Sequence, residues 1–522
     1  MDVMQIRSFT HTIVEQARAL TRSRPPAAPA SPQWIGAARA HDGQPLQFAD
    51  GELGFWFSLG AVSERSVRVW LRDPDCRPRE ATLEIDGKVR GSVTLTPDPD
   101  HDCTTAADLM LDRAYPNAEV VVRLGGLERR ARLQPLPDTP TPFSFVFGSC
   151  HQPFGPPQEG VLPLTPAAGI FRQIAGVMDQ HDARFLALIG DQIYSDGVDP
   201  IDVREDARHA RRPPSDEELR ERYRWLYRGY FNVQPFRELL EQYPTLMSWD
   251  DHDITEGWGA LIDWSDVDWR VFRAAEATYR EYQHMRHLGA SVDDRATYHR
   301  SFWFGNVGFF MLDLRSVRNY AEGRLFGDQQ WHAFHAFLEE ASARDTRTLF
   351  IVAGIPVVHH APALVRMAER VPHKYGTDLR DRWSAMPITH ERTRFLDLLF
   401  GWQSARPGRQ VVLLSGDVHA GAAFTVESHK GPGRIEQWTS SPLSTHAALP
   451  EVVANVVGSA LVNLGEDGYH SKRHTLVLGN NFGLVQVEPL ADGGHRVQLQ
   501  HYGYQPGKGV RVASNEVSLP SG

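Results

Sequence analysis

Short, almost wholly apolar runs recur from residue 143 onward, and each of them ends in a polar or glycine-bearing turn. Helix-like segments such as residues 167–181 and 328–343 lie between these runs. Strands that are apolar on both sides belong in sheets that are covered on both faces. We therefore predict an α/β layered domain whose functional residues collect where the strands end. The predicted strands are FSFVFGSC (143–150), RFLALIGD (184–191), TLMSWDD (245–251), VGFFMLDLR (307–315), TLFIVAG (348–354) and VVLLSGD (411–417).

The region before residue 139 has a different pattern. Five short alternating segments between residues 53 and 126 predict a small antiparallel β-sandwich, and the proline-rich stretch 135–142 separates it from the α/β region. Within the α/β region, we expect a solvated loop and helix at 198–222 and an extension packed on the domain at 446–522. The predicted units are an N-terminal helix and linker at 1–40, the β-sandwich at 41–138 and the α/β domain at 139–522.

Charge and hydrophobicity argue against several classes of partner. The 522-residue chain has a net charge of -10 and no long basic run, so we expect neither a nucleic acid nor an anionic membrane as partner. Its apolar runs are far shorter than the roughly 20 residues that span a bilayer, and no transmembrane helix is expected. The first 24 residues resemble an amphipathic helix rather than a secretory signal, which favours a cytoplasmic location. A chain trimmed of its signal would look the same, so a periplasmic location stays open.

The three cysteines are too few, and odd in number, for a disulfide framework, although a bridge between Cys76 and Cys103 stays open. The third, Cys150, ends the first apolar strand of the α/β region. A lone cysteine at such a place is ordinarily a small buried hydrophobic residue, and the alternatives are a metal ligand or a nucleophile. Metal ligation would use Cys150 together with the carboxylates at other strand ends, whereas a nucleophilic cysteine would leave those carboxylates without a role.

Acidic residues follow three of the predicted strands. Asp191 ends one strand and Tyr194 comes three residues later; a carboxylate there can bridge two cations, and a phenolate is a hard donor suited to ferric iron. The segment SWDDHDITEGWG (248–259) flanks three aspartates and a histidine with tryptophans, which favours partly desolvated carboxylates that need cations. Asp417 and His419 end a third strand and project the same way, so they could bind one metal or two.

The order of these motifs resembles the PhoD-like (alkaline phosphatase D) metallophosphoesterase family over most of residues 45–445. The resemblance implies hydrolysis of phosphoric esters and a layered, four-layer αββα-type metallophosphoesterase core behind an N-terminal antiparallel β-sandwich domain. The form DDHDITEGWG is similar to one subgroup of the family rather than to the asparagine-rich version of secreted members. In chain order the motifs are GSC (148–150), GDQIY (190–194), WDDHD (249–253), DLRSVR (313–318), SGDVH (415–419) and TSSPLS (439–444).

The resemblance also implies a ligand set for a dinuclear metal site. Asp191 is similar to the family's bridging aspartate, and Cys150 and Tyr194 are similar to its ferric-iron ligands. Asp251 occupies the position of asparagine in the general metallophosphoesterase motif Gly-Asn-His-Glu. The complete set that the resemblance implies is Cys150, Asp191, Tyr194, Asp251, Asp417 and His419.

Two further residues are expected to act on the substrate. His252 holds the place of the histidine in the same general motif, and it would stabilise the transition state or protonate the leaving group. Arg315 is a candidate partner for phosphate because a guanidinium forks well onto it. The alternative for Arg315 is a structural salt bridge with Asp313 or Asp250.

The implied cofactors are Fe³⁺ and a second divalent cation, with Ca²⁺ placed first and Mn²⁺, Mg²⁺ or Zn²⁺ as alternatives. An oxygen-rich ligand set suits Ca²⁺, Mg²⁺ or Mn²⁺, whereas His359 or His360 at the site would favour Zn²⁺. The expected function is metal-dependent phosphomonoesterase or phosphodiesterase activity on a small phosphoester. Two other functions stay open, namely a cysteine-based hydrolase that uses Cys150 and a catalytically silent, metal-stabilised scaffold or binding protein of the same fold.

Overall fold

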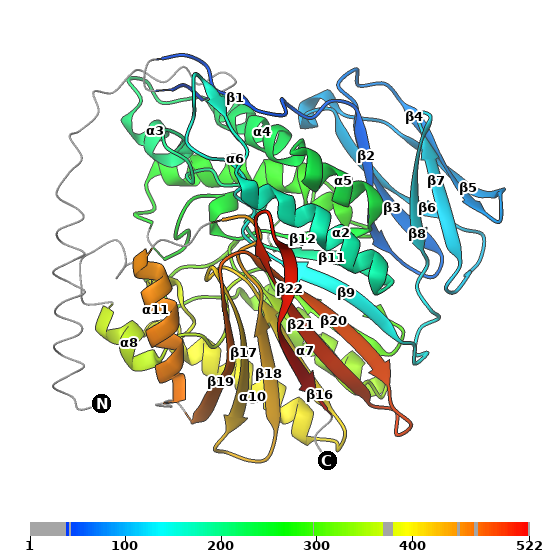
Figure 1. The fold of residues 1–522 in the computed structure, drawn as a ribbon, viewed down its shortest axis with the longest axis vertical. Helices are drawn as coiled ribbons and strands as arrows, with labels where there is room; N and C mark the ends of the chain where they lie inside the picture. The colour runs from blue at the N-terminus through cyan, green and yellow to red at the C-terminus, as the bar shows by residue number, and fades with distance from the viewer. Residues whose placement is uncertain are drawn as a thin grey trace.

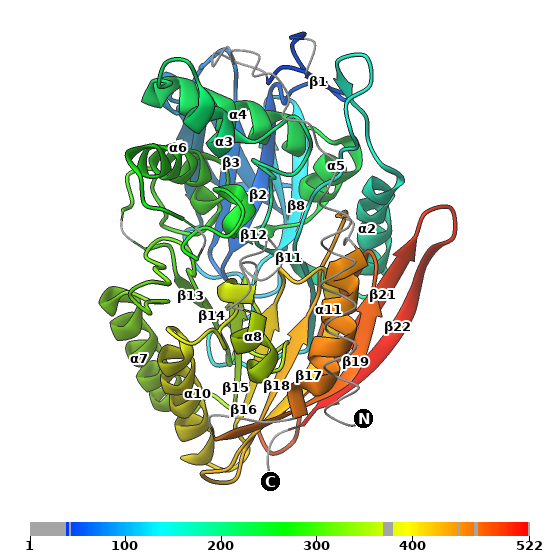
Figure 2. The same cartoon turned by 90° about the vertical axis from the view of Figure 1, so that its left-hand side faces the viewer.

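The computed structural model describes residues 38–40, 43–260, 262–295, 297–368, 379–445, 449–463 and 468–519. Two large β-sheets form its centre (Figures 1 and 2). The six-stranded sheet has the order β12 (Thr245–Ser248), β11 (Ala183–Ile189), β9 (Phe143–Gly148), β20 (Asn481–Pro489), β21 (His495–Gln505) and β22 (Gly509–Ser518). The seven-stranded sheet has the order β13 (Arg300–Phe304), β14 (Val307–Met311), β15 (Thr348–Ala353), β16 (Gln410–Ser415), β18 (Arg434–Thr439), β17 (Ala420–Ser428) and β19 (Tyr469–Leu478).

All six apolar runs that were predicted as strands form strands of these sheets. β11 pairs in parallel with β9 and β12, and β14, β15, β16 and β18 form a second parallel set. The facing sides of the two sheets share one hydrophobic core. In that core the Phe145 ring lies 5.6 Å from the Phe309 ring and 5.4 Å from the Phe350 ring. The strands are therefore covered on this face by the opposite sheet.

Helices cover the outer faces of both sheets (Figure 2). On the six-stranded sheet lie α2 (Ile170–Gln180), α3 (Val203–His209), α4 (Asp216–Phe231), α5 (Gln234–Gln242) and α6 (Asp266–Tyr282). On the seven-stranded side lie α7 (Asp328–Ala343), α8 (Pro362–Ala368), α10 (Thr389–Ser404) and α11 (Leu449–Ala460). The predicted helices at 167–181 and 328–343 correspond to α2 and α7. Among the described residues, no helix has the length and apolar character needed to cross a membrane.

Two smaller antiparallel sheets precede this core and share a hydrophobic cluster of their own. The three-stranded sheet contains β2 (Trp56–Val62), β3 (Ser66–Arg72) and β6 (Thr104–Met110). The four-stranded sheet contains β5 (Lys88–Leu95), β4 (Arg79–Ile85), β7 (Glu119–Leu124) and β8 (Leu127–Arg132). A short parallel pair joins β1 (Gln47–Phe48) to β10 (Val161–Leu162).

The sequence did not predict β6 and β8. β8 has the sequence LERRAR and buries only Arg129, so it lacks the apolar alternation of a strand. A signal for its hairpin was present in Gly125 and Gly126, which both have positive φ and join β7 to β8.

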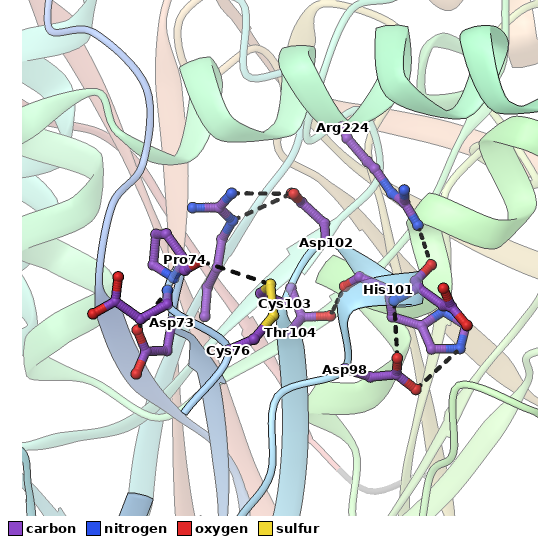
Figure 3. The surroundings of a disulfide bond; sticks show 12 residues. Asp73, Pro74, Cys76, Asp98, His101, Asp102, Cys103, Thr104 and Arg224 are labelled. Atoms are coloured by element: carbon purple, nitrogen blue, oxygen red, sulfur yellow. Dashed lines mark hydrogen bonds and ion pairs between the residues drawn. A yellow bond between two sulfur atoms is a disulfide. The ribbon is translucent and has the colours of Figure 1, made fainter. Parts of the chain in front are cut away.

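A disulfide bridge lies where the small sheets meet α4 and α6 (Figure 3). It joins Cys76 to Cys103, the pairing that the sequence left open. Asp102, next to Cys103, accepts hydrogen bonds from Arg228 of α4 at 3.1 Å and from the hydroxyl of Tyr282 at the end of α6. The bridged loop thus carries a carboxylate that binds both helices.

Three predicted segments either differ from the structure or lie outside the residues that it describes. Residues 198–222 form α3 and the first part of α4, and Val203 and Leu219 are wholly buried, so the segment packs into the core instead of being solvated throughout. The C-terminal segment supplies β19 to one large sheet and β20, β21 and β22 to the other. The predicted N-terminal helix and linker fall almost entirely in residues 1–37, outside the described residues.

Candidate metal centre

The predicted ligands lie on four loops at the carboxyl ends of parallel strands. Three of these loops follow β9, β11 and β12 of the six-stranded sheet, and one follows β16 of the seven-stranded sheet. Cys150, Asp191, Asp417 and His419 have φ angles of 65°, 55°, 65° and 49°. Left-handed backbone is unfavourable for side chains with a Cβ atom, at a cost of about 1–3 kcal/mol, and it concentrates at functional sites. The loops therefore hold these four side chains in an arrangement that the backbone alone would not choose.

One part of the site gathers sulfur, oxygen and nitrogen donors from three strand ends. The Sγ atom of Cys150 lies 3.3 Å from Oδ2 of Asp191, and the Tyr194 hydroxyl lies 3.2 Å from Nε2 of His419. Ser441 donates a hydrogen bond to Cys150 Sγ at 3.0 Å. Cys150, Asp191 and Tyr194 are nearly inaccessible to solvent. The structure thus brings together the three residues expected around ferric iron, with His419 beside them.

The other part of the site consists of carboxylates. Asp191, Asp250 and Asp251 each offer an oxygen within 4.8 Å of the others. Asp251 accepts a hydrogen bond from the Gly257 backbone at 2.7 Å, which fixes the orientation of its carboxylate. The carboxylate of Asp417 belongs to the fourth loop. Asp191 therefore lies close both to Cys150 and to the other carboxylates, Asp250 and Asp251.

Burial and mutual repulsion disfavour the charged forms of these acids. Burial, followed by the neighbouring carboxylates, raises the pKa of Asp191 well above its usual range, even though His252 opposes this shift. Burial and then Asp191 raise the pKa of the Cys150 thiol, and burial with Cys150 raises the pKa of Tyr194. Buried acids of this kind ionise when a cation compensates them.

The donor set fits metal cations. A thiol, a phenol, three carboxylates and an imidazole converge on one buried site, and buried carboxylates without cations are costly. The acidic groups of the site could therefore hold metal ions.

His252 lies beside the donors and is held by Asp196. Its ring stacks on Tyr194 with 4.1 Å between centroids, and its Nδ1 atom lies 2.6 Å from Oδ1 of Asp196. Burial alone would lower the pKa of His252, but the charges of Asp196 and Asp251 raise it well above its usual value. Asp196 in turn accepts a hydrogen bond from Thr255 at 3.2 Å. The ring orientation of His252 is thus fixed, and Asp196 is a partner whose role the sequence did not reveal.

Arg315 does not have the freedom expected of a phosphate partner. It is wholly buried, and its Nε atom donates to Asp250. Its two terminal nitrogens bind Asp381 at 3.0 and 2.8 Å, the carbonyl of Trp258 at 2.9 Å and Asp251 at 3.2 Å. All three nitrogens of the guanidinium are therefore engaged within the protein, which matches the salt-bridge alternative with Asp250.

Arg382 is the guanidinium that the sequence did not single out. It pairs with Asp417. Burial raises the pKa of Asp251, but Arg315 and His252 lower it, and Arg382 adds a smaller effect in the same direction, so that the pKa is about 2. Its side chain is 9% exposed, whereas that of Arg315 is 0% exposed. No motif surrounds Arg382 in the sequence, so only the tertiary structure places it at the site.

His359 and His360 lie outside the groups of metal-binding donors found among the described residues. His359 Nε2 lies 3.0 Å from the Oδ1 atom of Asn455, whose amide donates to the Val418 carbonyl at 2.7 Å. Burial lowers the pKa of His359 to about 3, so its imidazole is neutral. The contact supports the backbone between Asp417 and His419 and adds no imidazole to the donor set.

The chain is similar to known phosphatases. Residues 145–488 match the family model of the PhoD-like phosphatases. A solved structure of PhoD is 16% identical, with a TM-score of 0.64 over 89% of this chain and 90% of its own chain. The purple acid phosphatase PPD1 from yellow lupin (Lupinus luteus) is 11% identical, with a TM-score of 0.54 over 89% of this chain and 74% of its own.

No curated protein sequence matches the chain. At these identities the two structures show a shared fold, and the family model spans more than half of the 522 residues. The carboxyl-end site lies within the matched range, as do both large sheets except for β21, β22 and the end residues Phe143, Ser144 and Pro489. The chain therefore belongs to the PhoD-like phosphatase family, and it is a phosphatase of the metallophosphoesterase kind.

Proposed function

We propose that this protein hydrolyses small phosphoric esters, monoesters or diesters, at a dinuclear centre that holds Fe³⁺ and a second divalent cation. The observation that carries the proposal is the convergence of Cys150, Asp191, Tyr194 and His419 at 3.2–3.3 Å contacts beside a carboxylate group. Cys150, Tyr194 and His419 would hold iron, and Asp191 would be shared between the two ions. Asp251 and Asp417 would complete the second position.

The second cation is proposed to be Ca²⁺, with Mn²⁺ and Mg²⁺ as the next candidates and Zn²⁺ after them. The carboxylates of Asp191, Asp251 and Asp417 supply oxygen donors, which hard cations prefer. His359 binds Asn455 and so adds no imidazole that would favour Zn²⁺.

The protein's own side chains have defined tasks in this hydrolysis. When bound, the cations would acidify a water molecule and offset the charge of the phosphoryl group. Burial lowers the pKa of His252 but the charge of Asp196 raises it, and Asp196 holds its Nδ1 atom, so its Nε2 atom would give a proton to the leaving alkoxide. Arg382, which is less buried than Arg315, would turn from Asp417 to the phosphoryl oxygens. Arg315 would act indirectly by keeping Asp250 and Asp251 in place.

Several wider features belong to the same proposal. Helices outside two facing sheets support the four-layer αββα description, and the two small sheets with a common core support an N-terminal β-sandwich. The division at about residue 139 follows the proline-rich connection between β8 and β9. We propose a small phosphoester as the binding partner, without a nucleic acid or a membrane. The bridge between Cys76 and Cys103 favours an oxidising compartment such as the periplasm over the cytoplasm.

The proposal is tested by metal analysis of the purified protein, together with a visible spectrum and turnover of aryl phosphate and bis-aryl phosphate. We expect about one equivalent of iron, a charge-transfer band from the Tyr194 phenolate, and activity that chelation removes and metal restores. Metal binding without turnover of either substrate would instead indicate the silent scaffold. Turnover that survives chelation but not a thiol reagent would indicate the cysteine hydrolase.

A further inference from the structure

Asp253, the third aspartate of the WDDHD motif, is wholly buried and binds the backbone of two separate loops. Its Oδ2 atom accepts hydrogen bonds from the backbone N–H of Asp191 at 3.0 Å and of Asp250 at 2.9 Å. Its Oδ1 atom accepts from Gln192 at 3.2 Å and from Ile193 at 3.3 Å. One carboxylate therefore joins the loop after β11 to the loop after β12.

These two loops carry most of the proposed site. Asp191 lies on the first loop and Tyr194 directly follows the last bonded residue, whereas Asp251 and His252 lie on the second. A direct contact between the loops also exists, because the backbone N–H of His252 donates to Oδ1 of Asp191 at 3.3 Å. The hydrogen bonds that meet at Asp253 thus help to set the distance between the Asp191 carboxylate and the residues of the loop after β12.

Asp253 is itself held by Gln283, the residue that follows α6. The Nε2 atom of Gln283 donates to Oδ1 of Asp253 at 2.8 Å and to the hydroxyl of Tyr227 at 2.9 Å. Gln283 is wholly buried, and no salt bridge to Asp253 is present among the described residues. Neutral N–H groups alone therefore stabilise this carboxylate, in contrast to Asp250 and Asp251, which pair with Arg315.

We infer that Asp253 is a positioning residue of the metal centre, and that Gln283 keeps its carboxylate turned toward the two loops. It does not contact the substrate; it fixes the spacing of Asp191 and Tyr194 relative to Asp251 and His252. This inference rests on the proposed dinuclear function. Partners behind metal ligands commonly change metal affinity or activity by about 10- to 100-fold when they are mutated.

The main test is Asp253→Asn, which keeps the size of the side chain but leaves a single acceptor oxygen. Full-length protein is stripped with a chelator and titrated with Mn²⁺, and iron content, turnover and melting temperature are measured on the protein as purified. We expect Mn²⁺ affinity and kcat each to fall about 10- to 100-fold. The matched control is Glu391→Gln, because Glu391 is also a buried carboxylate that accepts from backbone and ring N–H groups, at 2.8 Å from Phe326 and 3.0 Å from Trp331.

The control variant should lose thermal stability but keep Mn²⁺ affinity and kcat. If Asp253→Asn behaves in the same way, Asp253 serves only the stability of the fold and the inference is overturned. If the unmodified protein neither binds metal nor hydrolyses phosphoesters, the proposed function itself fails, and that outcome is visible without any variant.

A second pair of variants tests the role of Gln283 and does not depend on the stability of Asp253→Asn. Gln283→Met removes only the hydrogen bonds of the amide, and we expect a weaker loss of Mn²⁺ affinity than for Asp253→Asn. In the double variant Asp253→Asn/Gln283→Glu the new amide at the Oδ1 position can donate to the new carboxylate, but it cannot accept from the N–H groups of Gln192 and Ile193, so the recovery is partial. The double variant should bind Mn²⁺ about fivefold more tightly than Asp253→Asn alone. Wild-type affinity in Gln283→Met, or no recovery in the double variant, would contradict the assigned role of Gln283.

Discussion

Two clusters of buried carboxylates in this protein are balanced in opposite ways. At the disulfide junction, Asp102 lies beside Cys103 (Figure 3) and pairs with Arg72 and Arg228, each at 3.1 Å. Glu281 in the same region pairs with Arg224 at 2.7 Å and with His101 at 3.3 Å. Each carboxylate of the junction thus meets two cationic side chains from this chain.

The metal centre has more acids than cations. Burial opposes ionisation in both clusters, yet Arg228 and Arg72 still lower the pKa of Asp102, whereas the pKa of Asp191 is raised. Burial of an acid is therefore not what distinguishes a metal site. Asp191 differs in that no arginine pairs with it among the described residues, so that bound cations would supply the positive charge, whereas Asp251 of the same centre pairs with Arg315.

The largest effect is expected for Asp191→Asn. Asparagine tolerates the left-handed backbone of this position but cannot supply the charge that two cations share. We expect iron and the second metal to fall below about one tenth of their wild-type content, and kcat/KM to fall about 1000-fold or more. Metal analysis and aryl phosphate turnover measure both quantities. Wild-type metal content in this variant would remove Asp191 from the ligand set.

A smaller loss, confined to the rate, is expected for His252→Ala. The imidazole is proposed to donate a proton and is not among the proposed ligands, so metal content should remain as in the wild type. We expect kcat to fall about 100- to 10,000-fold, the range of general acid catalysis. The acidity of the leaving group provides a check, because an ester with an acidic phenol needs less protonation and should be slowed less. Equal losses for all leaving groups would contradict this role of His252.

Features that depend on neighbouring residues could be predicted from the sequence. The six apolar strands and the polar residues at their ends follow from short windows. Cys150, Asp191 and Tyr194 follow the adjacent strands β9 and β11, whereas His419 follows β16 and meets them only because the two large sheets pack together. β8 escaped prediction because its charged sequence lies at the edge of a sheet, where few apolar side chains are needed.

Contacts between distant segments could not be predicted in the same way. Arg315 lies in a motif and Arg382 does not, yet only the structure shows that Asp250 and Asp381 bind Arg315 and that Arg382 pairs with Asp417. The bond between Gln283 and Asp253 joins residues 30 positions apart without any motif around the glutamine. Whether each hydrogen-bonding group of a side chain finds a partner depends on the folded core and not on the neighbouring residues in the sequence.

Asp102→Asn is the counterpart of Asp191→Asn at the disulfide junction. It should lower the free energy of unfolding and leave the metal centre intact. Asparagine again suits a left-handed residue, here with a φ of 53°. The change leaves Arg72 and Arg228 without their shared carboxylate, which costs about 3–5 kcal/mol in the free energy of unfolding when a buried pair is broken. Denaturant unfolding and metal analysis test this. Loss of iron in this variant would mean that the two clusters are not independent.

The smallest expected effect is a change in the pH dependence of stability at His101. The hydrogen bond from His101 to Glu281 raises the pKa of this imidazole, although burial opposes the shift. A pKa that is higher in the folded state gives stability that is fully present below the unfolded value, about 6.5, and is lost as pH rises through the folded value. The melting temperature of the wild type should therefore exceed that of His101→Gln most at about pH 6, and the difference should shrink by about pH 9. Because the ring is 29% exposed, solvent weakens the pair and keeps this difference small. A difference that stays constant between these pH values would show that His101 stabilises the junction by packing alone, and that the charge balance there rests on the arginines.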